Sequence, residues 1–531
     1  MSTPHGPQAG DEATSTKLDE MLEIRDKIRT DMGGARKVDR VHLEGRLTVR
    51  EHIELLVDPG SFREIGTFVS EFHDDGDRWD LPGDGIIGGA ATIEGRPVTV
   101  AANDDTVRRG TNGNRGAKKI DRLFNAAERL ATPFIMLGQS SGGRLPEGMQ
   151  SDKWASGTHR NGIFTRLVNR ARTIPVVSVI VGTSFGSSSF YAGLSDFVVQ
   201  LDDTCLALTS PRVIEVATGE KVSMKDLGGN ELHATVTGQI DATATSPQDA
   251  YDKVRLFLSF LPSSAGQRLP FVAPGPILPD SEIGELVPAR RTRAYDVRKV
   301  ITRLVDGEQF LELKPEFSTN LVSGIGRVAG VPVGFVANQP QRGAGALTPD
   351  ACRKATRLIC LCDAYGLPLI FLADTPGFLV GSTVERERAL AKAMMMVRAG
   401  SMANVPKCMV VLRKAFGLGF TVMGGGDPVA VDLSVAWPGA EIGFMDPTVA
   451  ANVLFDGQSA ELDPEQRAAF LSEKAHALEA DFAPYGVASS MTIDEIIEPG
   501  ETKRWLAQIV SNEATLSGSF AGGPLANWPF W

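Results

Sequence analysis

The sequence predicts an α/β protein built from two tandem copies of one unit, and three observations predict it. Apolar runs that end in small residues alternate with amphipathic helical segments, a succession typical of parallel sheets covered by helices. The same order of elements returns about 235 residues later in the chain. The chain has 531 residues, which exceeds one ordinary core, and its 56 glycines suit the tight turns of α/β proteins.

Helices open the predicted first unit. Apolar residues fall at helical spacing across residues 16–32, on a charged background. Residues 1–15, rich in Ser, Thr, Gly, Pro and acids, precede this helix and are expected to form a disordered tail. A second helix is expected to start after Thr48 and to run through Val57, because Thr48 and Glu51 form a capping-box pattern.

A hairpin and a further helix follow in the sequence. The glycine-rich stretch 82–89 leads into strands at 90–93 and 97–103, which are joined by a turn at 94–96. Apolar residues at helical spacing then predict an amphipathic helix over residues 117–131.

Two predicted strands end in small residues, where a ligand could bind. The strand at 134–137 stops in Ser140-Ser141-Gly142-Gly143, and after a helix at 162–173 the strand at 176–181 runs into Gly186-Ser187-Ser188-Ser189. Ligands of parallel α/β sheets sit at the carboxyl ends of the strands. A Ser-Gly-Gly turn there exposes consecutive backbone N–H groups, which can hold an anion or a developing oxyanion.

The second half of the chain repeats these landmarks in the same order. Five blocks match at nearly constant spacing, which favours a duplication of units of about 235 residues. A Pro/Ser/Gly cluster over 262–279 is the linker candidate, so we expect domains at 16–265 and 280–531. The matching positions are Asp58 with Asp306, Gly95, Pro97 and Asn103 with Gly330, Pro332 and Asn338, Pro133 and Gly142 with Pro368 and Gly377, Pro175, Phe185 and Gly186 with Pro406, Phe416 and Gly417, and Pro211 with Pro447.

Composition excludes several classes of protein. A net charge of −11 and a pI near 5.3 argue against nucleic acid as the main partner. No apolar run reaches 18 residues, so no membrane span is expected. The five cysteines form no CxxC pair, which argues against a zinc site or a disulfide framework and favours reduced thiols in the cytoplasm.

Several longer motifs resemble one family. The motifs are Gly45-Arg46-Leu47-Thr48-Val49-Arg50-Glu51, Gly83-Asp84-Gly85, Gly142-Gly143-Arg144-Leu145-Pro146-Glu147-Gly148, Ala337-Asn338-Gln339-Pro340, Asp374-Thr375-Pro376-Gly377-Phe378, Val411-Leu412-Arg413-Lys414-Ala415-Phe416-Gly417 and Ala436-Trp437-Pro438. With them, the chain from about residue 16 to 531 is similar to the carboxyltransferase (β) subunit of biotin-dependent acyl-CoA carboxylases, of the propionyl-CoA carboxylase β type. The resemblance implies two tandem crotonase-like (ClpP/crotonase) domains, each a spiral of ββα units, within a homohexamer.

The resemblance also implies the reaction and its site. The N-terminal half would bind an acyl-CoA and the C-terminal half carboxybiotin, and the carboxyl group would pass between them through an enolate held by backbone amides. Biotin's own nitrogen could take the α proton, so no strong side-chain base is required. The residues implied at the acyl-CoA enolate are Ser141, Gly142, Gly143, Gly186 and Ser187; at the charge left on biotin, Phe378, Leu418 and Gly419; and around the biotin, Gly377, Phe378, Phe416, Gly417 and Thr421.

The sequence also predicts the partners of this chain, and it departs from the family pattern at three positions. The chain lacks a Met-Lys-Met biotinylation motif and a glycine-rich ATP-binding pattern, so biotin is expected on a separate biotin carboxylase or carrier subunit. Ser140 stands where the family has an acid, and Arg144 follows Gly143 where the family has Ala. Thr421 replaces an Asp that the family uses to set acyl-chain preference, so an acetyl or propionyl preference does not carry over.

Other interpretations remain open from the sequence. The same site could run in reverse in an acyl-CoA decarboxylase, or the chain could be a biotin-independent crotonase-type hydratase or hydrolase, or a non-catalytic scaffold subunit. The basic stretches Arg290-Arg291-Thr292-Arg293, Arg108-Arg109 and Lys118-Lys119 could contact CoA phosphates or could simply be solvated.

Overall fold

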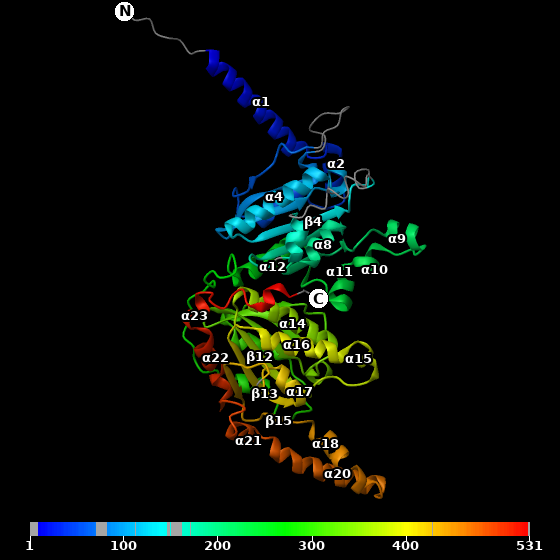
Figure 1. The fold of residues 1–531 in the computed structure, drawn as a ribbon, viewed down its shortest axis with the longest axis vertical. Helices are drawn as coiled ribbons and strands as arrows, with labels where there is room; N and C mark the ends of the chain where they lie inside the picture. Colours follow the sequence, from blue (N-terminus) through cyan, green and yellow to red (C-terminus); the bar gives the residue numbers. More distant parts are fainter. Residues whose placement is uncertain are drawn as a thin grey trace, which may run out of the picture. The chain divides into compact units, whose positions relative to one another are not determined.

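The computed structural model describes residues 9–70, 82–111, 113–145, 149, 162–169, 171–426 and 428–528 (Figure 1). The chain forms two compact units. The first comprises Met1–Asn169, Val176–Leu232 and Thr243–Arg255, and the second comprises Arg170–Pro175, His233–Ala242 and Leu256–Trp531. The domain limits expected from the sequence, 16–265 and 280–531, remain a prediction of where the duplicated halves begin and end.

Two eight-stranded sheets with the same strand order confirm the predicted α/β class and the duplication. In each sheet an antiparallel hairpin is followed by parallel strands. The first sheet contains β1 (Arg63–Glu64), β2 (Ile86–Ile93), β3 (Arg96–Asn103), β4 (Phe134–Ser141), β5 (Val176–Phe185), β6 (Phe197–Leu201), β7 (Cys205–Leu206) and β8 (Ala242–Ala244). The second contains β9 (Phe310–Leu313), β10 (Leu321–Val328), β11 (Val331–Asn338), β12 (Leu369–Thr375), β13 (Lys407–Phe416), β14 (Leu433–Ala436), β15 (Glu441–Gly443) and β16 (Glu495–Ile496).

Both predicted strands that lead to the site are longer than their apolar runs. β4 continues past Leu137 to Ser141, and β5 continues past Val181 to Phe185. Pairing between them resumes after an irregularity between Gly138 and Ser140. The apolar run therefore marks the buried middle of each strand, whereas backbone pairing carries it further toward the glycine turn.

The predicted helices of the first unit are present with different ends. The first helix is α1 (Ala9–Asp31), which begins inside the expected tail of residues 1–15; residues 1–8 lie outside the described part of the chain. The amphipathic helix is α4 (Asn114–Leu130). None of the helices in the described ranges is both long and apolar enough to span a membrane.

The helix expected over 162–173 is shorter, because α7 spans only Ile163–Asn169. Arg172 has a φ of 47°, which a right-handed helix does not allow. Its buried guanidinium donates hydrogen bonds to the backbone oxygens of Leu525 (2.8 Å) and Trp528 (2.7 Å). This long-range anchor, which no local pattern encodes, replaces the last helical turn.

The capping box predicted at Thr48 is confirmed at the start of α3 (Val49–Leu56). The Thr48 hydroxyl accepts a hydrogen bond from the Glu51 amide, and the Glu51 carboxylate accepts one from the Thr48 amide (2.7 Å). In the second unit, Asp296 caps α13 (Val297–Leu304) 248 residues later by accepting from the Arg298 amide (3.0 Å).

Loss of either cap should destabilise the fold modestly. Substitution Thr48→Ala or Asp296→Ala is expected to lower the free energy of unfolding by about 1 kcal/mol, because one helical N–H loses its acceptor. Urea unfolding measures this change. Thr48→Ser and Asp296→Asn keep an acceptor and serve as controls; equal losses in control and alanine variants would contradict the capping role.

Candidate active site at the glycine turns

The first candidate site lies where β4 and β5 end. Beyond β4, Gly142 has a φ of 108°, a conformation that L side chains rarely adopt. The buried Ser140 hydroxyl accepts a hydrogen bond from the Gly142 amide at 3.2 Å and lies 3.4 Å from the Gly142 carbonyl oxygen. Ser141 and Gly143 are exposed on either side of the buried Gly142. Ser140, which replaces the acid of the family pattern, thus holds the turn in shape.

The turn after β5 packs directly against this one. Gly186 has a φ of 62°, and a Cβ placed on it would lie 3.3 Å from the Cα of Gly142. The helix α8 (Ser187–Gly193) begins immediately afterwards, so its first amides have no acceptor within the helix. The structure therefore brings together the predicted residues Ser141, Gly142, Gly143, Gly186 and Ser187.

A buried ion pair anchors the chain just beyond the first turn. The Arg144 guanidinium lies 2.5 Å from the Asp84 carboxylate and donates to the Thr111 carbonyl at 3.2 Å. The same carboxylate accepts from the amides of Arg115 and Gly116 at the start of α4. Arg144, a departure from the family pattern, thus ties the Ser-Gly-Gly turn to the Gly83-Asp84-Gly85 motif. Residues 146–148 of the same motif lie outside the described part of the chain.

The second unit repeats the arrangement where β12 and β13 end. Gly377 has a φ of 112°, and the Thr375 hydroxyl accepts from its amide at 3.1 Å, as Ser140 does for Gly142. A Cβ on Gly419 would lie 2.7 Å from the Cα of Gly377. The short helix α17 (Gly417–Val422) carries Gly419. The predicted residues Gly377, Gly417, Leu418 and Gly419 therefore share one pair of turns.

The remaining predicted residues of the second turn differ in which of their groups could contact a ligand. Phe378 forms a parallel bridge with Leu347, in which Gly377 and Leu379 make the two hydrogen bonds. Its own N–H therefore points away from Leu347. Thr421 is half-buried in α17. Phe416 is 1% exposed with its ring against Phe482, so it can reach a ligand only through its backbone.

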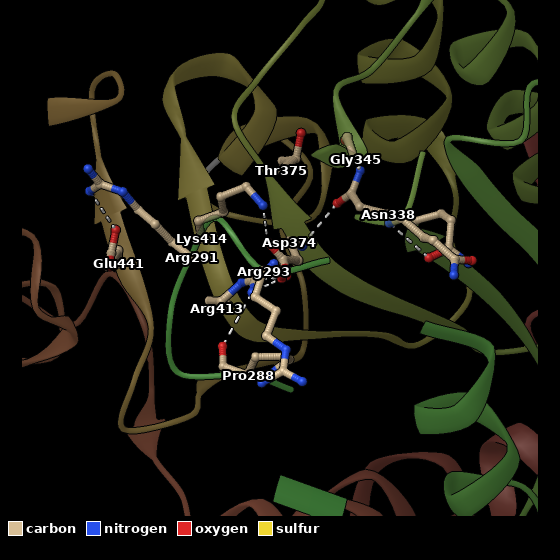
Figure 2. Close-up of polar contacts among 12 residues, drawn as sticks. Pro288, Arg291, Arg293, Asn338, Gly345, Asp374, Thr375, Arg413, Lys414 and Glu441 are labelled. Carbon is tan, nitrogen blue, oxygen red and sulfur yellow. Dashed lines mark hydrogen bonds and ion pairs between the residues drawn. The ribbon is translucent and has the colours of Figure 1, made fainter. Parts of the chain in front are cut away.

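The strands that lead to the second turn carry a buried charge cluster, whose polar contacts are drawn in Figure 2. Asp374 on β12 is fully buried, and its carboxylate pairs with Lys414 at 2.6 Å and with Arg413 at 3.1 Å. Asn338 on β11 accepts from the Asp374 amide at 3.2 Å and donates to the Gly345 carbonyl at 3.2 Å. The sequence motifs contained all four residues, but nothing in their spacing showed that they meet.

The structure shows what several residues of the basic stretches contact. Lys119 is 5% exposed and donates to the Ile86 and Gly66 carbonyls, so it does not face a CoA phosphate. Arg291 forms ion pairs with Glu441 and Glu479. Arg108 and Arg109 are exposed, and a Cβ on the neighbouring Gly110 would lie 2.1 Å from the carbonyl oxygen of Gln139, near the end of β4. Of the three stretches, Arg108-Arg109 is the one placed beside the first turn.

The cysteines are unsuited to nucleophilic catalysis. All five are buried free thiols, and burial raises the pKa of Cys205 to about 11 and that of Cys352 to about 12. Because the thiolate is the reactive form, native protein should react slowly with dithionitrobenzoate at about pH 8, whereas denatured protein should react at all five cysteines. Rapid native labelling, followed by absorbance with urea-denatured protein as the reference, would contradict this assignment.

Comparisons with known proteins identify the family of the chain. The family model described as "Carboxyl transferase domain" matches residues 40–519. The methylmalonyl-CoA carboxyltransferase 12S subunit of Propionibacterium freudenreichii subsp. shermanii is 35% identical over 504 residues, covering 94% of this chain and 94% of its own. The propionyl-CoA carboxylase beta chain of Saccharopolyspora erythraea is 36% identical over 500 residues, covering 90% of this chain and 89% of its own.

Solved structures give the same result for the fold. The crystal structure of the transcarboxylase 12S hexamer, with methylmalonyl-CoA and methylmalonic acid bound, superimposes with a TM-score of 0.87 at 34% sequence identity and covers 97% of both chains. A single-chain, multi-domain long-chain acyl-CoA carboxylase matches with a TM-score of 0.81 at 31% identity, over 93% of this chain and 50% of that one.

Proposed function

The chain belongs to the carboxyl transferase domain family of biotin-dependent acyl-CoA carboxylases, and on that premise we propose how its two turns divide the reaction. The first turn binds the acyl-CoA thioester, and the second binds carboxybiotin carried on a separate protein. The carboxyl group moves from a ring nitrogen of biotin to the α-carbon of the acyl-CoA. The observation that carries the proposal is the duplicated pair of glycine turns, in which Gly186 abuts Gly142 and Gly419 abuts Gly377.

The first turn fits an enolate. Removing the α proton leaves negative charge on the thioester oxygen, and backbone amides that are already fixed can stabilise it without reorganising. We assign this role to the amides around Ser141, Gly142, Gly143, Gly186 and Ser187. The Ser140 hydroxyl acts only by holding Gly142.

The second turn fits the biotin ring. We assign the amides around Phe378, Leu418 and Gly419 to the charge that develops on the ring when the carboxyl group leaves, and the surroundings Gly377, Phe416, Gly417 and Thr421 to ring binding. The electrons balance simply: the N–C bond of carboxybiotin breaks, the new C–C bond forms at the α-carbon, and the α proton ends on the ring nitrogen. No side-chain base is required.

Several finer points belong to the proposal. Arg108 and Arg109, exposed beside the first turn, are the candidates for CoA phosphates, because guanidinium groups pair well with phosphate oxygens. We propose a homohexamer, by similarity to the transcarboxylase 12S hexamer, and a biotin carboxylase or carrier subunit as partner. The free, buried cysteines support a cytoplasmic location.

One experiment tests the function directly. The tagged chain is purified from its native cells, its partners are probed with avidin, and radiolabelled bicarbonate fixation is assayed with acetyl-, propionyl- and longer acyl-CoAs. A biotinylated partner and fixation on one acyl-CoA are expected. Release of CO₂ from a carboxyacyl-CoA without ATP-dependent fixation would favour the decarboxylase direction. Absence of both a biotinylated partner and fixation would overturn the proposal.

A further inference from the structure

The two turns have the same backbone conformation but differ in the charge of the side chains next to them. At the position of Asp374, the first unit has Gln139, 235 residues earlier, and at the positions of Arg413 and Lys414 it has Gly182 and Thr183. A Cβ on Gly182 would lie 2.7 Å from the Cγ of Gln139, so a neutral side chain packs on a glycine there. The second unit instead places a carboxylate between two cations.

These charges are shielded from water. The side chains of Asp374, Arg413 and Lys414 are 0%, 3% and 6% exposed. Lys414 donates to one carboxylate oxygen, and Arg413 lies against the other (Figure 2). In a poorly solvated site, charge interactions are several times stronger than in water.

On the side away from Asp374, the Arg413 guanidinium is surrounded by neutral groups. It donates to the carbonyls of Pro288 (3.3 Å), Arg290 (3.2 Å) and Arg293 (2.8 Å), and it stacks 5.0 Å from the centre of the Tyr295 ring. Burial, and then the charge of Asp374, raise the pKa of Tyr295 well above its ordinary value, so this phenol stays neutral. The cluster therefore contains two cations and one anion.

The excess positive charge lies next to the second turn along both strands. Asp374 directly precedes Thr375, which holds Gly377, and Lys414 lies three residues before Gly417. Arg291, a further cation near the cluster, pairs with two carboxylates, Glu441 and Glu479, so this group carries one net negative charge. Its side chains are 20–34% exposed, so water screens this group more strongly than it screens the buried cluster.

We infer that the Asp374–Arg413–Lys414 cluster makes the second turn selective for the anionic partner of the reaction, the carboxylated ring of biotin, and stabilises the charge left on that ring. Lys414 and Arg413 are positioning residues in this role, because they act through the field and the fixed strand ends. The inference rests on the proposed function. It adds the reason why two turns of the same geometry take different ligands.

A charge-balance series tests the inference. The purified chain is assayed for carboxylation of free biotin by the carboxylated form of the acyl-CoA that the fixation experiment identifies, which runs the transfer from the α-carbon to the ring nitrogen. Lys414→Met removes the excess cation and is expected to lower kcat/KM for biotin at least 10-fold, with the affinity for the CoA ester, measured by calorimetry, changed less than 2-fold. Asp374→Asn combined with Lys414→Met restores one net positive charge and should recover part of the loss.

Lys407→Met is the matched control. Lys407 starts the same strand, β13, and is also buried, donating to the Gly400 and Val429 carbonyls. It lies seven residues from Lys414, roughly 23 Å along an extended strand. This variant should keep kcat/KM for biotin within 3-fold of the parent. If Lys414→Met does not fold, Lys414→Gln, which removes the same charge, replaces it in the series.

The outcomes separate the two proposals. If the parent chain is active and Lys414→Met has the same kcat/KM for biotin as Lys407→Met, the inference is overturned and the proposed function stays intact. Failure of the folded double variant to recover any activity would also overturn it, because geometry and not charge would then explain the loss. A parent chain that does not carboxylate biotin with that CoA ester would overturn the proposed function, and the inference with it.

Discussion

Substituting Gly419 by valine is expected to lower carboxyl transfer by roughly 10²–10³-fold, the effect typical of losing one preorganised oxyanion donor. Even the first carbon of the new side chain would lie 2.7 Å from the Cα of Gly377 and 3.1 Å from a methyl carbon of Thr375. Both neighbours are fixed backbone or buried side chain, so α17 must shift and its amides must leave their positions. The measurement is the rate of acyl-CoA-dependent bicarbonate fixation by the native complex.

Gly439→Ala provides the control for this prediction. A Cβ on Gly439 meets no atom within 4 Å, and its backbone has no positive φ, so activity should stay within 2-fold. In a biotin-independent hydratase or hydrolase the second unit would be only structural. Full activity of a folded Gly419→Val variant would therefore contradict the two-turn mechanism and favour that alternative.

Removing Asp241 is expected to destabilise the second unit by about 3–5 kcal/mol, the cost of leaving buried cations without their partner. Its carboxylate, 1% exposed, lies 3.0 Å from Lys314 Nζ and 2.8 Å from a guanidinium nitrogen of Arg357. These contacts fix the segment His233–Ala242 to the residue that follows β9 and to α14 (Pro349–Tyr365). Asp241→Ala leaves both cations buried, so the urea midpoint of the unfolding transition should fall.

The pH dependence of this loss has a definite sign. Burial raises the pKa of Asp241, but the charges of Arg357 and Lys314 outweigh that effect and leave it below its ordinary value of 3.8. A lowered pKa in the fold contributes stability that is fully present above that ordinary value and is lost as pH falls through the folded pKa. The difference between wild type and Asp241→Ala should therefore be constant near neutral pH and shrink below about pH 4.

Asp456→Asn is the matched control for the stability measurement. Asp456 pairs with Arg467 at 2.9 Å, but the two side chains are 70% and 43% exposed. A solvent-exposed ion pair contributes about 0–1 kcal/mol, so this variant should unfold almost as the parent does. Equal losses in Asp241→Ala and Asp456→Asn would show that the buried triad contributes no more than a surface pair.

The sequence by itself determined the duplication, the α/β class and the family. Constant spacing between matching residues survives in both sheets. The matched glycines, such as Gly142 and Gly377, sit in turns at a positive φ that few other residues adopt. The capping box at Thr48 was readable because its two partners are three residues apart. The glycine turns were found for the same reason: strand periodicity and the following small residues are local signals.

Only the tertiary structure decided how the turns are held and charged. Arg144 meets Asp84 across 60 residues, Lys414 meets Asp374 across 40, and Arg172 ends α7 by reaching carbonyls more than 350 residues away. The tertiary structure also showed that Lys119, which looks like a surface cation in the sequence, is buried and donates hydrogen bonds to backbone carbonyls. Local patterns report backbone conformation and the face of a helix or strand. The partner of a buried charge is set by which strand ends the fold brings together, because burial without a partner would be too costly.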